Sequence, residues 1–324
     1  MTSSSRDPSW NDRNPMTGRR IGRLWCLLAA GYALGAAAQS AAPAAAPAVE
    51  PISPRAIDTL QRIRETGAMP IGVRDASFPF SFVAAGKRPQ GYSVDLCLEI
   101  ADAIKSELGL PRLEVRYIPV SPANSILALQ DGKIDLECGS TSNTRERQKE
   151  VAFAYTTFVA GIKLLAKKSS QISGIDDLRG KTVVVSRGTA GEKLIKDINA
   201  ERQLQMNIVA AADHDAAFKA VDQGGAVAFP LDDVLLYGLI AKASRPDDFA
   251  VVGKHLSIEP LAIAMRKGDV KFEAIVDRAL SQLFASGEIR SLYDKWFATR
   301  ELTVPLNPLL KEAFAMPNTY PAWP

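Results

Sequence analysis

The sequence predicts an α/β fold arranged as two lobes. From residue 71 onward, short apolar runs alternate with amphipathic helical patterns, which is typical of sheets covered by helices. Two such series follow one another in the chain. The length of 324 residues, with 47% hydrophobic and 23% charged residues, allows two separate cores and argues against a fibre or a disordered chain.

The first series predicts one β-α-β-α-β lobe. In its longer helix, Val94, Cys97, Ile100 and Ile104 recur at helical spacing. The shorter helix ends at an Asp-Gly pair, and the last strand runs into a polar turn. The expected strands are 70–73, 113–119 and 134–138, and the expected helices are 93–108 and 124–130.

The second series begins after Val159 and has a similar alternation. Strands are expected at 161–166 and 182–186 and a helix at 191–198, with further short runs at 175–178, 208–210, 218–222 and 227–231. The last third of the chain holds an apolar run at 261–265 and two strong helical patterns at 270–286 and 287–297. The sequence has no short-period repeat.

The N-terminal residues have the pattern of a secretory signal. Arg19, Arg20 and Arg23 precede an uncharged apolar run at 24–38, which ends in small residues that suit signal peptidase. We expect cleavage to remove residues 1–38 and the Ala- and Pro-rich stretch 39–54 to be a linker. The alternative is an uncleaved anchor, but this run is shorter than the ~20 residues that a spanning helix needs.

Two further residues refine this prediction. Cys26 lies at the front of the apolar run, close behind Arg23, and so does not resemble a lipoprotein acylation site. The segment before Met16 is unusually polar, whereas a start at Met16 gives a compact basic leader, and both starts remain open. The expected product is a soluble periplasmic protein.

The predicted mature chain is close to neutral. Residues 1–38 contain five Arg and two Asp, which leaves 34 basic and 34 acidic residues in the remainder. A nucleic-acid-binding protein is expected to keep a strong basic excess, so no nucleic-acid partner is predicted. Any preference for an anion must come from a few placed residues and not from the net charge.

Two cysteines remain in the predicted mature chain. Cys97 lies on an expected helix and Cys138 on an expected strand, both within apolar patterns. In an oxidising compartment such a pair can form a disulfide, and two buried free thiols are the alternative.

A set of short motifs carries a family resemblance. The motifs are GVRDASFPFSF at 72–82, GYSVD at 91–95, DLECGSTSN at 135–143 with ERQ at 146–148, LRGKTVVV at 178–185, SRGT at 186–189, DH at 213–214, AFPLDD at 228–233, SGE at 286–288 and KWF at 295–297. Each is weak alone. Their order and spacing together resemble the family 3 extracellular solute-binding proteins, and closely the glutamate/aspartate-binding subgroup, over about residues 60–299.

The resemblance implies the type II periplasmic-binding-protein fold, in which two α/β lobes are joined by two crossing strands and hold a ligand in the cleft between them. It places lobe one at about 55–157 plus 257–324 and lobe two at about 158–256. It implies a binding protein and not an enzyme: the periplasmic component of an ABC-type amino-acid importer, monomeric, without cofactor or metal, and partnered by a membrane permease.

The resemblance also implies residues for the two charged groups of an amino acid. Arg147 corresponds to the position that binds the α-carboxylate, onto which a guanidinium can fork; a solvated surface Arg is the alternative. Asp232 corresponds to the position that binds the ammonium group, with Asp233 as the competing helix cap. Ser140 and Ser142 lie at turn positions that offer carbonyl and hydroxyl groups, or serve only the turn.

Three more residues follow from the same comparison of motifs. Thr189 begins an expected helix whose free N–H groups suit a carboxylate, although it can equally be a cap. Arg74 and His214 align with positions around the distal carboxylate of an acidic ligand. A surface Arg and a structural His are the alternatives.

Two positions depart from the subgroup. In close relatives a Ser and, three residues later, an Arg help to hold the distal carboxylate, and here these positions are Pro122 and Ser125. Losing one charge-assisted hydrogen bond is expected to cost roughly 1.5–3 kcal/mol. Because Arg74 and His214 remain, glutamate or aspartate is the expected ligand. Glutamine or asparagine, with Ser125 contacting the amide, is the alternative.

Two other functions use a similar fold. Cyclohexadienyl-type dehydratases place a general acid in the cleft, and Glu137 and Glu192 would be the candidates here, but the sequence has no catalytic triad, metal cluster or phosphate loop at suitable spacing. A sensor lobe that presents a ligand to a receptor is the third interpretation. The segment 301–324 has five prolines and no helical pattern. It resembles an extension that acidic-amino-acid-binding proteins pack against their lobes, and a disordered tail is the alternative. We assign this segment no function.

Overall fold

The computed structural model describes residues 58–84 and 88–322, which belong to one compact unit, Ser53–Pro324. The predicted signal segment 1–38, the linker 39–54 and the alternative start at Met16 lie outside the described residues. Among the helices of the described part, none has both the length and the apolar character needed to cross a membrane.

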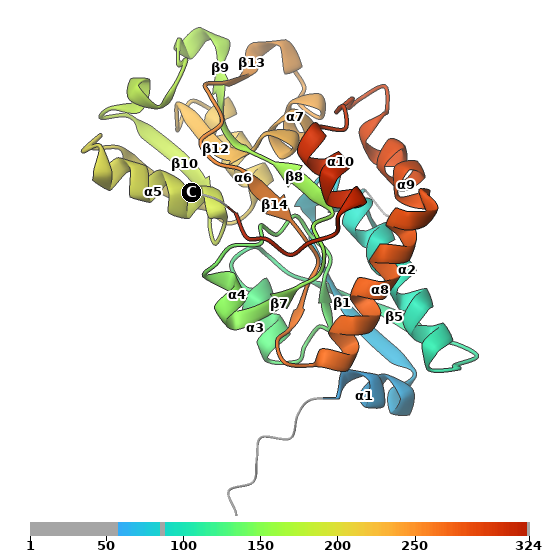
Figure 1. Ribbon diagram of the computed structural model, residues 1–324. Coiled ribbons are helices and arrows are strands. Elements are labelled where there is room, and N and C mark those ends of the chain that lie inside the picture. The colour runs from blue at the N-terminus through green and yellow to red at the C-terminus, as the bar shows by residue number, and fades with distance from the viewer. Residues whose placement is uncertain (1–57, 85–87, 323–324) are drawn as a thin grey trace, which may run out of the picture. The chain divides into compact units, whose positions relative to one another are not determined.

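A five-stranded sheet forms the centre of the first lobe (Figure 1). Strand β1 runs parallel to β5 and β6, whereas β15 runs antiparallel to β6 and β7. In sheet order the strands are β5 (Glu114–Pro119), β1 (Ala68–Val73), β6 (Leu136–Glu137), β15 (Ala264–Arg266) and β7 (Val151–Phe153). The observed strand is shorter than the expected strand 134–138, because only Leu136 and Glu137 form the ladder with β1.

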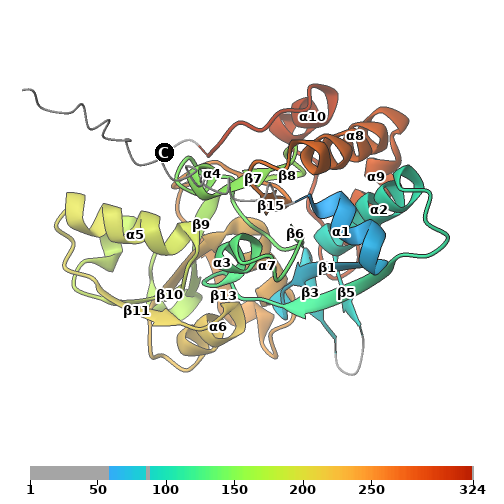
Figure 2. The same ribbon diagram turned by 90° about the horizontal axis from the view of Figure 1, so that it is seen from below.

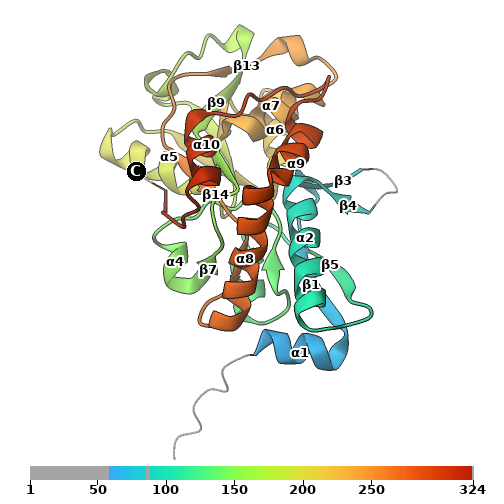
Figure 3. The same cartoon turned by 45° about the vertical axis from the view of Figure 1, so that its right-hand side comes forward.

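The helices of this lobe bury the apolar faces that their spacing predicts. Helix α2 turns Val94, Cys97, Ile100 and Ile104 inward, and it packs along α8, as Figure 3 shows. Helix α8 spans the predicted range 270–286. The helices are α1 (Thr59–Thr66), α2 (Tyr92–Glu107), α3 (Ser125–Gln130), α4 (Arg147–Glu150), α8 (Val270–Ser286) and α9 (Glu288–Phe297).

A second five-stranded sheet forms the centre of the second lobe. Its order is β11 (Asn207–Ala211), β10 (Thr182–Ser186), β12 (Ala228–Asp232), β9 (Ile162–Lys167) and β13 (Phe249–Val252). Its α-helices are α5 (Ala190–Glu201), α6 (His214–Asp222) and α7 (Asp233–Ala241), and its 3-10 turns are Lys168–Ser170, Ile175–Leu178 and Pro246–Asp248. Figure 2 shows α5 and α6 on opposite faces of this sheet. Accordingly, Val183 and Val185 pack in one core with Ile195, and Val184 packs in another with Val221.

Two crossing strands join the sheets. Strand β8 (Phe158–Ala160) connects β7 to β9, strand β14 (Glu259–Leu261) connects β13 to β15, and the two pair antiparallel. Along the chain, β1 and α2 are separated by a small three-stranded sheet of β2 (Ala76–Ser77), β3 (Ser81–Val83) and β4 (Pro89–Gln90). Next to the crossing, Phe80, Tyr92, Phe158, Tyr293 and Phe297 form a buried aromatic cluster.

The C-terminal segment is packed and partly helical, so the absence of a helical pattern at 301–324 was misleading. Helix α10 (Pro308–Ala315) begins with Pro at its first position and Asn307 as a cap that accepts from the Leu310 N–H. Leu310 and Ala313 are buried, and Phe314 packs against Phe284 of α8. A helix of eight residues with one buried edge gives too little periodic signal to be recognised.

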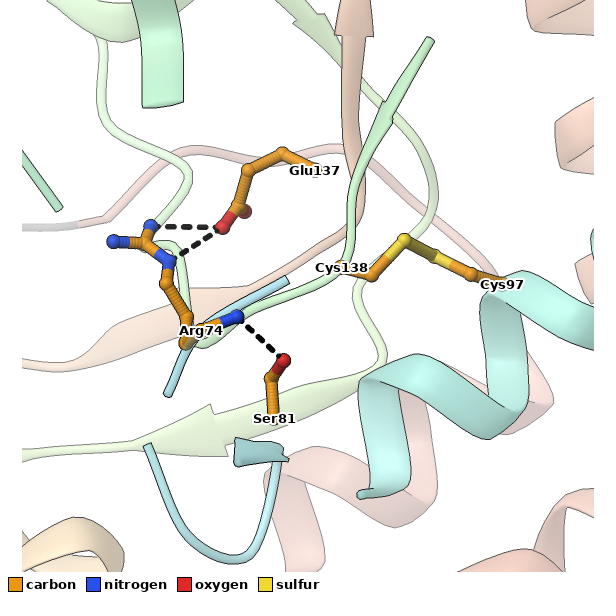
Figure 4. Close-up of a disulfide and its surroundings, with 5 residues drawn as sticks. All are labelled: Arg74, Ser81, Cys97, Glu137 and Cys138. Carbon is orange, nitrogen blue, oxygen red and sulfur yellow. Dashed lines mark hydrogen bonds and ion pairs between the residues drawn. A yellow bond between two sulfur atoms is a disulfide. The ribbon is translucent and has the colours of Figure 1, made fainter. Parts of the chain in front are cut away.

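The two cysteines form a disulfide, which resolves the alternatives left by the sequence. It joins Cys97 on α2 to Cys138, which directly follows β6, with 6.2 Å between the two Cα atoms (Figure 4). The bridge thus fixes the start of the turn at 139–143 to helix α2.

Candidate ligand-binding site

A pocket between the two lobes collects most of the residues predicted for the ligand. Its cavity volume is only about 20 Å³, because the side chains of the two lobes close tightly around it. Seven of the eight predicted residues line it, and Ser125 lies directly behind it in contact with Arg74. The lining residues are Arg74, Pro122, Ser140, Thr141, Ser142, Arg147, Thr189, Ala190, His214, Leu231 and Asp232.

The fold explains why these distant residues meet. Arg74 directly follows β1, Ser140–Ser142 follow β6, and Asp232 is the last residue of β12. The carboxyl ends of the central strands of both sheets therefore face the same cleft, where α/β proteins commonly bind ligands.

Arg74 is buried and is held by several neighbours. Its Nε donates to Oε1 of Glu137 at 2.9 Å, and its Nη2 donates to the hydroxyl groups of Thr141 at 3.0 Å and Ser125 at 3.2 Å. The backbone N–H of Arg74 donates to the Ser81 hydroxyl at 2.8 Å (Figure 4). The side chain is 5% exposed, so the alternative of a surface Arg is wrong.

This ion pair leaves two polar atoms without a partner among the described residues: Nη1 of Arg74 and Oε2 of Glu137. Buried polar atoms are normally paired, so an unpaired N–H group on a pocket-lining guanidinium can receive an oxygen of a ligand. Gly139 makes the arrangement possible. A Cβ at this position would lie 2.4 Å from Oε1 of Glu137 and 2.7 Å from Nε of Arg74.

Arg147 connects the two lobes. Its Nη1 donates to the carbonyl of Ser142 and its Nη2 to the carbonyl of Gly188 in the second lobe, both at 2.9 Å. Burial lowers the pKa of Arg147 and the charge of Arg74 lowers it further, while Glu137, Glu259 and Asp232 oppose the shift. Two N–H groups are thus used by carbonyls, and the others remain for a ligand oxygen.

Asp232 is buried in the second lobe, and its Oδ1 has no hydrogen-bond partner among the described residues. Burial raises the pKa of its carboxyl well above the ordinary value, the charges of Glu259 and Asp233 raise it further, and Arg147 opposes this. Asp233, in contrast, accepts from the Val234 N–H at 2.8 Å and contacts Nε2 of His255 at 2.9 Å. Of the two aspartates, Asp232 is the one that lines the pocket.

His214 is the first residue of α6 and is 2% exposed. Its Nδ1 lies 2.8 Å from the Ser186 hydroxyl. Burial, followed by the nearby charge of Arg74, lowers the pKa of His214 to about 3, so the ring is neutral at physiological pH. It can therefore offer a hydrogen bond to a ligand but not a positive charge.

The hydroxyl residues have different surroundings. Thr189 caps α5: its Oγ1 accepts from the Glu192 N–H at 3.1 Å and donates to the Ser186 carbonyl at 2.8 Å. The Ser142 hydroxyl is hydrogen-bonded to Glu259, and the Ser142 carbonyl accepts from Arg147. Ser140 also lines the pocket. Thr189 is therefore both a helix cap and part of the pocket: its hydroxyl caps α5, while the N-terminus of this helix lines the pocket.

Sequence reasoning missed Thr141 and Glu259. The Thr141 hydroxyl accepts a hydrogen bond from Arg74. Thr141 lies between Ser140 and Ser142, which the sequence analysis did select, but the sequence does not show in which direction each side chain of the turn points. Glu259 lies on β14, is 4% exposed and has an unpartnered Oε2. Burial raises the pKa of Glu259, while hydrogen bonds from Ser257 and Ser142 and the charge of Arg147 lower it. A single acid in an otherwise apolar run was the available signal.

The chemistry of the pocket is that of a receptor for a small ion with both signs of charge. Arg74 and Arg147 supply N–H donors, while Asp232 supplies a buried carboxyl oxygen, Oδ1, that has no partner among the described residues. In the described part of the chain, no group of three or more His, Cys, Asp or Glu residues could hold a metal ion.

Comparisons with known proteins agree with this architecture. The sequence model of the bacterial extracellular solute-binding proteins, family 3, matches residues 69–299. The L-glutamate/L-aspartate-binding protein of Pseudomonas aeruginosa is 45% identical over 267 residues, covering 80% of this chain and 88% of the relative. The glutamate/aspartate import solute-binding protein of Salmonella typhimurium is 40% identical over 272 residues, covering 82% of this chain and 90% of the relative.

Among solved structures, a mutant of ArgBP from T. maritima has a TM-score of 0.67 and 28% identity, covering 74% of this chain and 99% of that chain. The names of these proteins describe binding proteins and not enzymes. The extent of the family match, together with relatives at 40–45% identity over most of the sequence, leads to one conclusion: the chain belongs to the bacterial extracellular solute-binding proteins of family 3.

Proposed function

We propose that this protein is the solute-binding component of an ABC-type amino-acid importer and that it binds glutamate or aspartate between its lobes. The observation that carries the proposal is the pocket that Arg74 and Arg147 of one lobe share with Asp232 of the other, whose Oδ1 has no partner among the described residues. A free amino acid needs both kinds of partner, because burying its carboxylate or its ammonium group unpaired costs several kcal/mol. The relatives' names support the acidic ligand.

Arg147 and the N-terminus of α5 are proposed to hold the α-carboxylate. The remaining N–H groups of Arg147 and the helix N-terminus at Thr189 line the same pocket, and both favour an anion. Asp232 is proposed to accept the ammonium group, which would supply the missing partner of its Oδ1.

Arg74 is proposed to hold the distal carboxylate through Nη1, with His214 as a neutral hydrogen-bond partner. Ser125 acts indirectly in this scheme, since its hydroxyl accepts from Arg74. One feature favours the amide ligands as a second candidate. Glu137 neutralises the charge of Arg74, so the distal part of the pocket carries less positive charge than the arginines alone would suggest.

The dehydratase alternative has less support. Glu137 is paired with Arg74, and Glu192 is paired with Lys196 and accepts from the Gly188 N–H. Burial raises the pKa of Glu192, but these hydrogen bonds outweigh it and lower the pKa overall. Both acids are therefore engaged in ion pairs within the protein.

The cellular setting is part of the proposal. We place the protein in the periplasm after cleavage of residues 1–38, as a monomer that delivers its ligand to a membrane permease. The proposed lobe boundaries are 55–157 plus 257–324 for lobe one and 158–256 for lobe two, which the pairing of β8 with β14 supports.

Calorimetric titration of the exported protein with each of the twenty amino acids tests the proposal. Glutamate or aspartate should bind at one site per chain and more tightly than glutamine or asparagine. Ser125→Arg, which restores the subgroup's Arg, should tighten glutamate binding by about tenfold. A wild type that prefers glutamine, combined with no gain in Ser125→Arg, would contradict the acidic ligand. Binding of no amino acid would overturn the proposal as a whole.

A further inference from the structure

The C-terminal residues 316–322, here called the strap, contact residues 140–148, here called the ligand-binding turn, which contribute several residues to the ligand pocket. Asn143 donates from Nδ2 to the Thr319 carbonyl at 3.0 Å, and its own carbonyl accepts from the Ala322 N–H at 2.6 Å. Gln148 donates from Nε2 to the same Thr319 carbonyl at 2.9 Å. In Figure 1 the strap is the dark red segment between α10 and the end marked C.

Asn143 is the point at which the strap, the crossing strands and the pocket meet. The residue is fully buried, and its backbone N–H donates to the carbonyl of Pro260 in β14 at 2.8 Å. Its Oδ1 accepts from Gln148 at 2.9 Å. The preceding residue, Ser142, accepts from Arg147, so the position of Asn143 also determines where this carbonyl and the guanidinium lie.

The strap starts from a fixed point. Asn307, the cap of α10, donates from Nδ2 to the carbonyl of Val159 in β8 at 3.0 Å. The buried residues Leu310 and Ala313 hold α10 against the first lobe, and the Thr156 N–H donates to the Asn318 carbonyl at 3.0 Å. Helix α10 is therefore anchored beside β8, and the strap runs from the end of α10, past Thr156, to Asn143.

We propose that the strap positions the ligand-binding turn, residues 140–148, and so sets the affinity for the ligand. Removing the strap would leave the buried amide and carbonyl of Asn143 without these partners, and the turn would lose its external restraint. The free energy of ordering the turn would then be subtracted from the free energy of binding. This inference rests on the proposed function only in the identity of the ligand, because the restraint itself concerns the protein alone.

The contacts of the strap are mainly through its backbone, so truncation is the direct test. The exported protein ending at Met316 is compared with a matched control ending at Ala322. Calorimetry should give about a tenfold weaker affinity for glutamate in the shorter protein and wild-type affinity in the control. Hydrogen–deuterium exchange without ligand should rise in residues 140–148 of the shorter protein and stay unchanged in α5 and α6.

A milder variant guards against misfolding of the truncated protein. Gln148→Ala removes one contact to the strap and one to Asn143 and should weaken binding by about threefold. Unchanged exchange in residues 140–148 after truncation overturns the inference, and so does increased exchange with unchanged affinity. Exchange that rises equally in both lobes would assign the strap to general stability instead.

The outcome also separates the two proposals. If the wild type binds no glutamate, the ligand assignment fails, and the affinity measurement is repeated with the amino acid that does bind. If no amino acid binds, the exchange measurement alone decides whether the strap restrains the turn.

Discussion

Arg74 combines a buried ion pair with an N–H group that has no partner in the part of the chain that the structure describes. Its salt bridge to Glu137 spans 2.7 Å, and the two side chains are 5% and 0% exposed. Burying such a pair is costly unless its remaining hydrogen-bonding groups are satisfied. Among the described residues, Nη1 of Arg74 and Oε2 of Glu137 have no hydrogen-bond partner. Such unpaired buried atoms are expected at a site where a bound ligand supplies the missing partners.

The space around this ion pair gives the first prediction. Gly139→Ala would place a methyl group within 2.4 Å of Glu137 and 2.7 Å of Arg74, and should lower ligand affinity about tenfold by displacing the pair. Gly174→Ala is the matched control, because nothing lies within 4 Å of a Cβ there and its φ of −172° suits any residue. Calorimetry measures both, and equal affinities would contradict the role of Gly139.

Asp232 gives a prediction that joins stability to binding. Its pKa is raised in the folded protein, so protonation stabilises the fold at low pH and this stabilisation is lost as the pH rises through the raised pKa. At a pH above this raised pKa and without ligand, Asp232→Asn should therefore stabilise the protein by about 1–3 kcal/mol, because Asn carries no charge to bury. The same variant should lose amino-acid binding.

Urea unfolding with and without glutamate measures both effects. The wild type should gain stability from the ligand by mass action, and Asp232→Asn should not. A variant that is less stable than the wild type without ligand, or that still gains stability from glutamate, would rule out this role for Asp232.

At the scale of secondary-structure elements, the end of α7 in the second lobe contacts the small sheet β2-β3-β4 of the first lobe. Nζ of Lys242, the residue that follows α7, lies 4.1 Å from the centre of the Phe78 ring and 4.4 Å from that of Phe82. Gly238 allows this approach, because a Cβ there would lie 2.8 Å from the Phe78 carbonyl oxygen. This cation–π contact joins the second lobe to the first outside the ligand pocket.

We expect the contact to favour the closed arrangement of the lobes. Lys242→Met removes the charge at similar length and should weaken ligand binding by about two- to fivefold. Lys242→Arg keeps a cation over the rings and should bind as the wild type does. Calorimetry on the two variants decides, and an unchanged affinity in Lys242→Met would show that the contact does not contribute to closure.

For the molecule as a whole, division of the site between lobes predicts a ligand-driven closure. Arg74 and Arg147 lie on one lobe, and Asp232 and His214 lie on the other, so neither lobe alone can satisfy a bound amino acid. Small-angle scattering should show compaction of the exported protein when saturating glutamate is added. Asp232→Asn should show none at the same glutamate concentration, and compaction in that variant would contradict the division.

Local patterns determined much of the fold. The strand at Thr182–Ser186 and the helix at Val270–Ser286 have the predicted bounds, because alternation and helical spacing record directly which side chains face a core. Helix α7 was not predicted, because its sequence lacks such a periodic pattern. It is apolar nearly all round and buried, so it has no polar face to mark its period. The motifs also singled out Arg74 and Asp232, since charges at the ends of apolar strands stand out in a sequence.

The tertiary structure decided which of these residues are partners. The disulfide joins residues 41 positions apart, Arg74 and Glu137 are 63 apart, and Asn143 meets Thr319 across 176 positions. Periodicity reports whether a side chain is buried, but it does not report what the side chain meets when distant elements pack together. The sequence by itself therefore determined most of the elements, the family and most residues of the candidate site, but not helices α7 and α10. The ion pair behind Arg74 and the strap on Asn143 depend on long-range packing, which only the folded chain specifies.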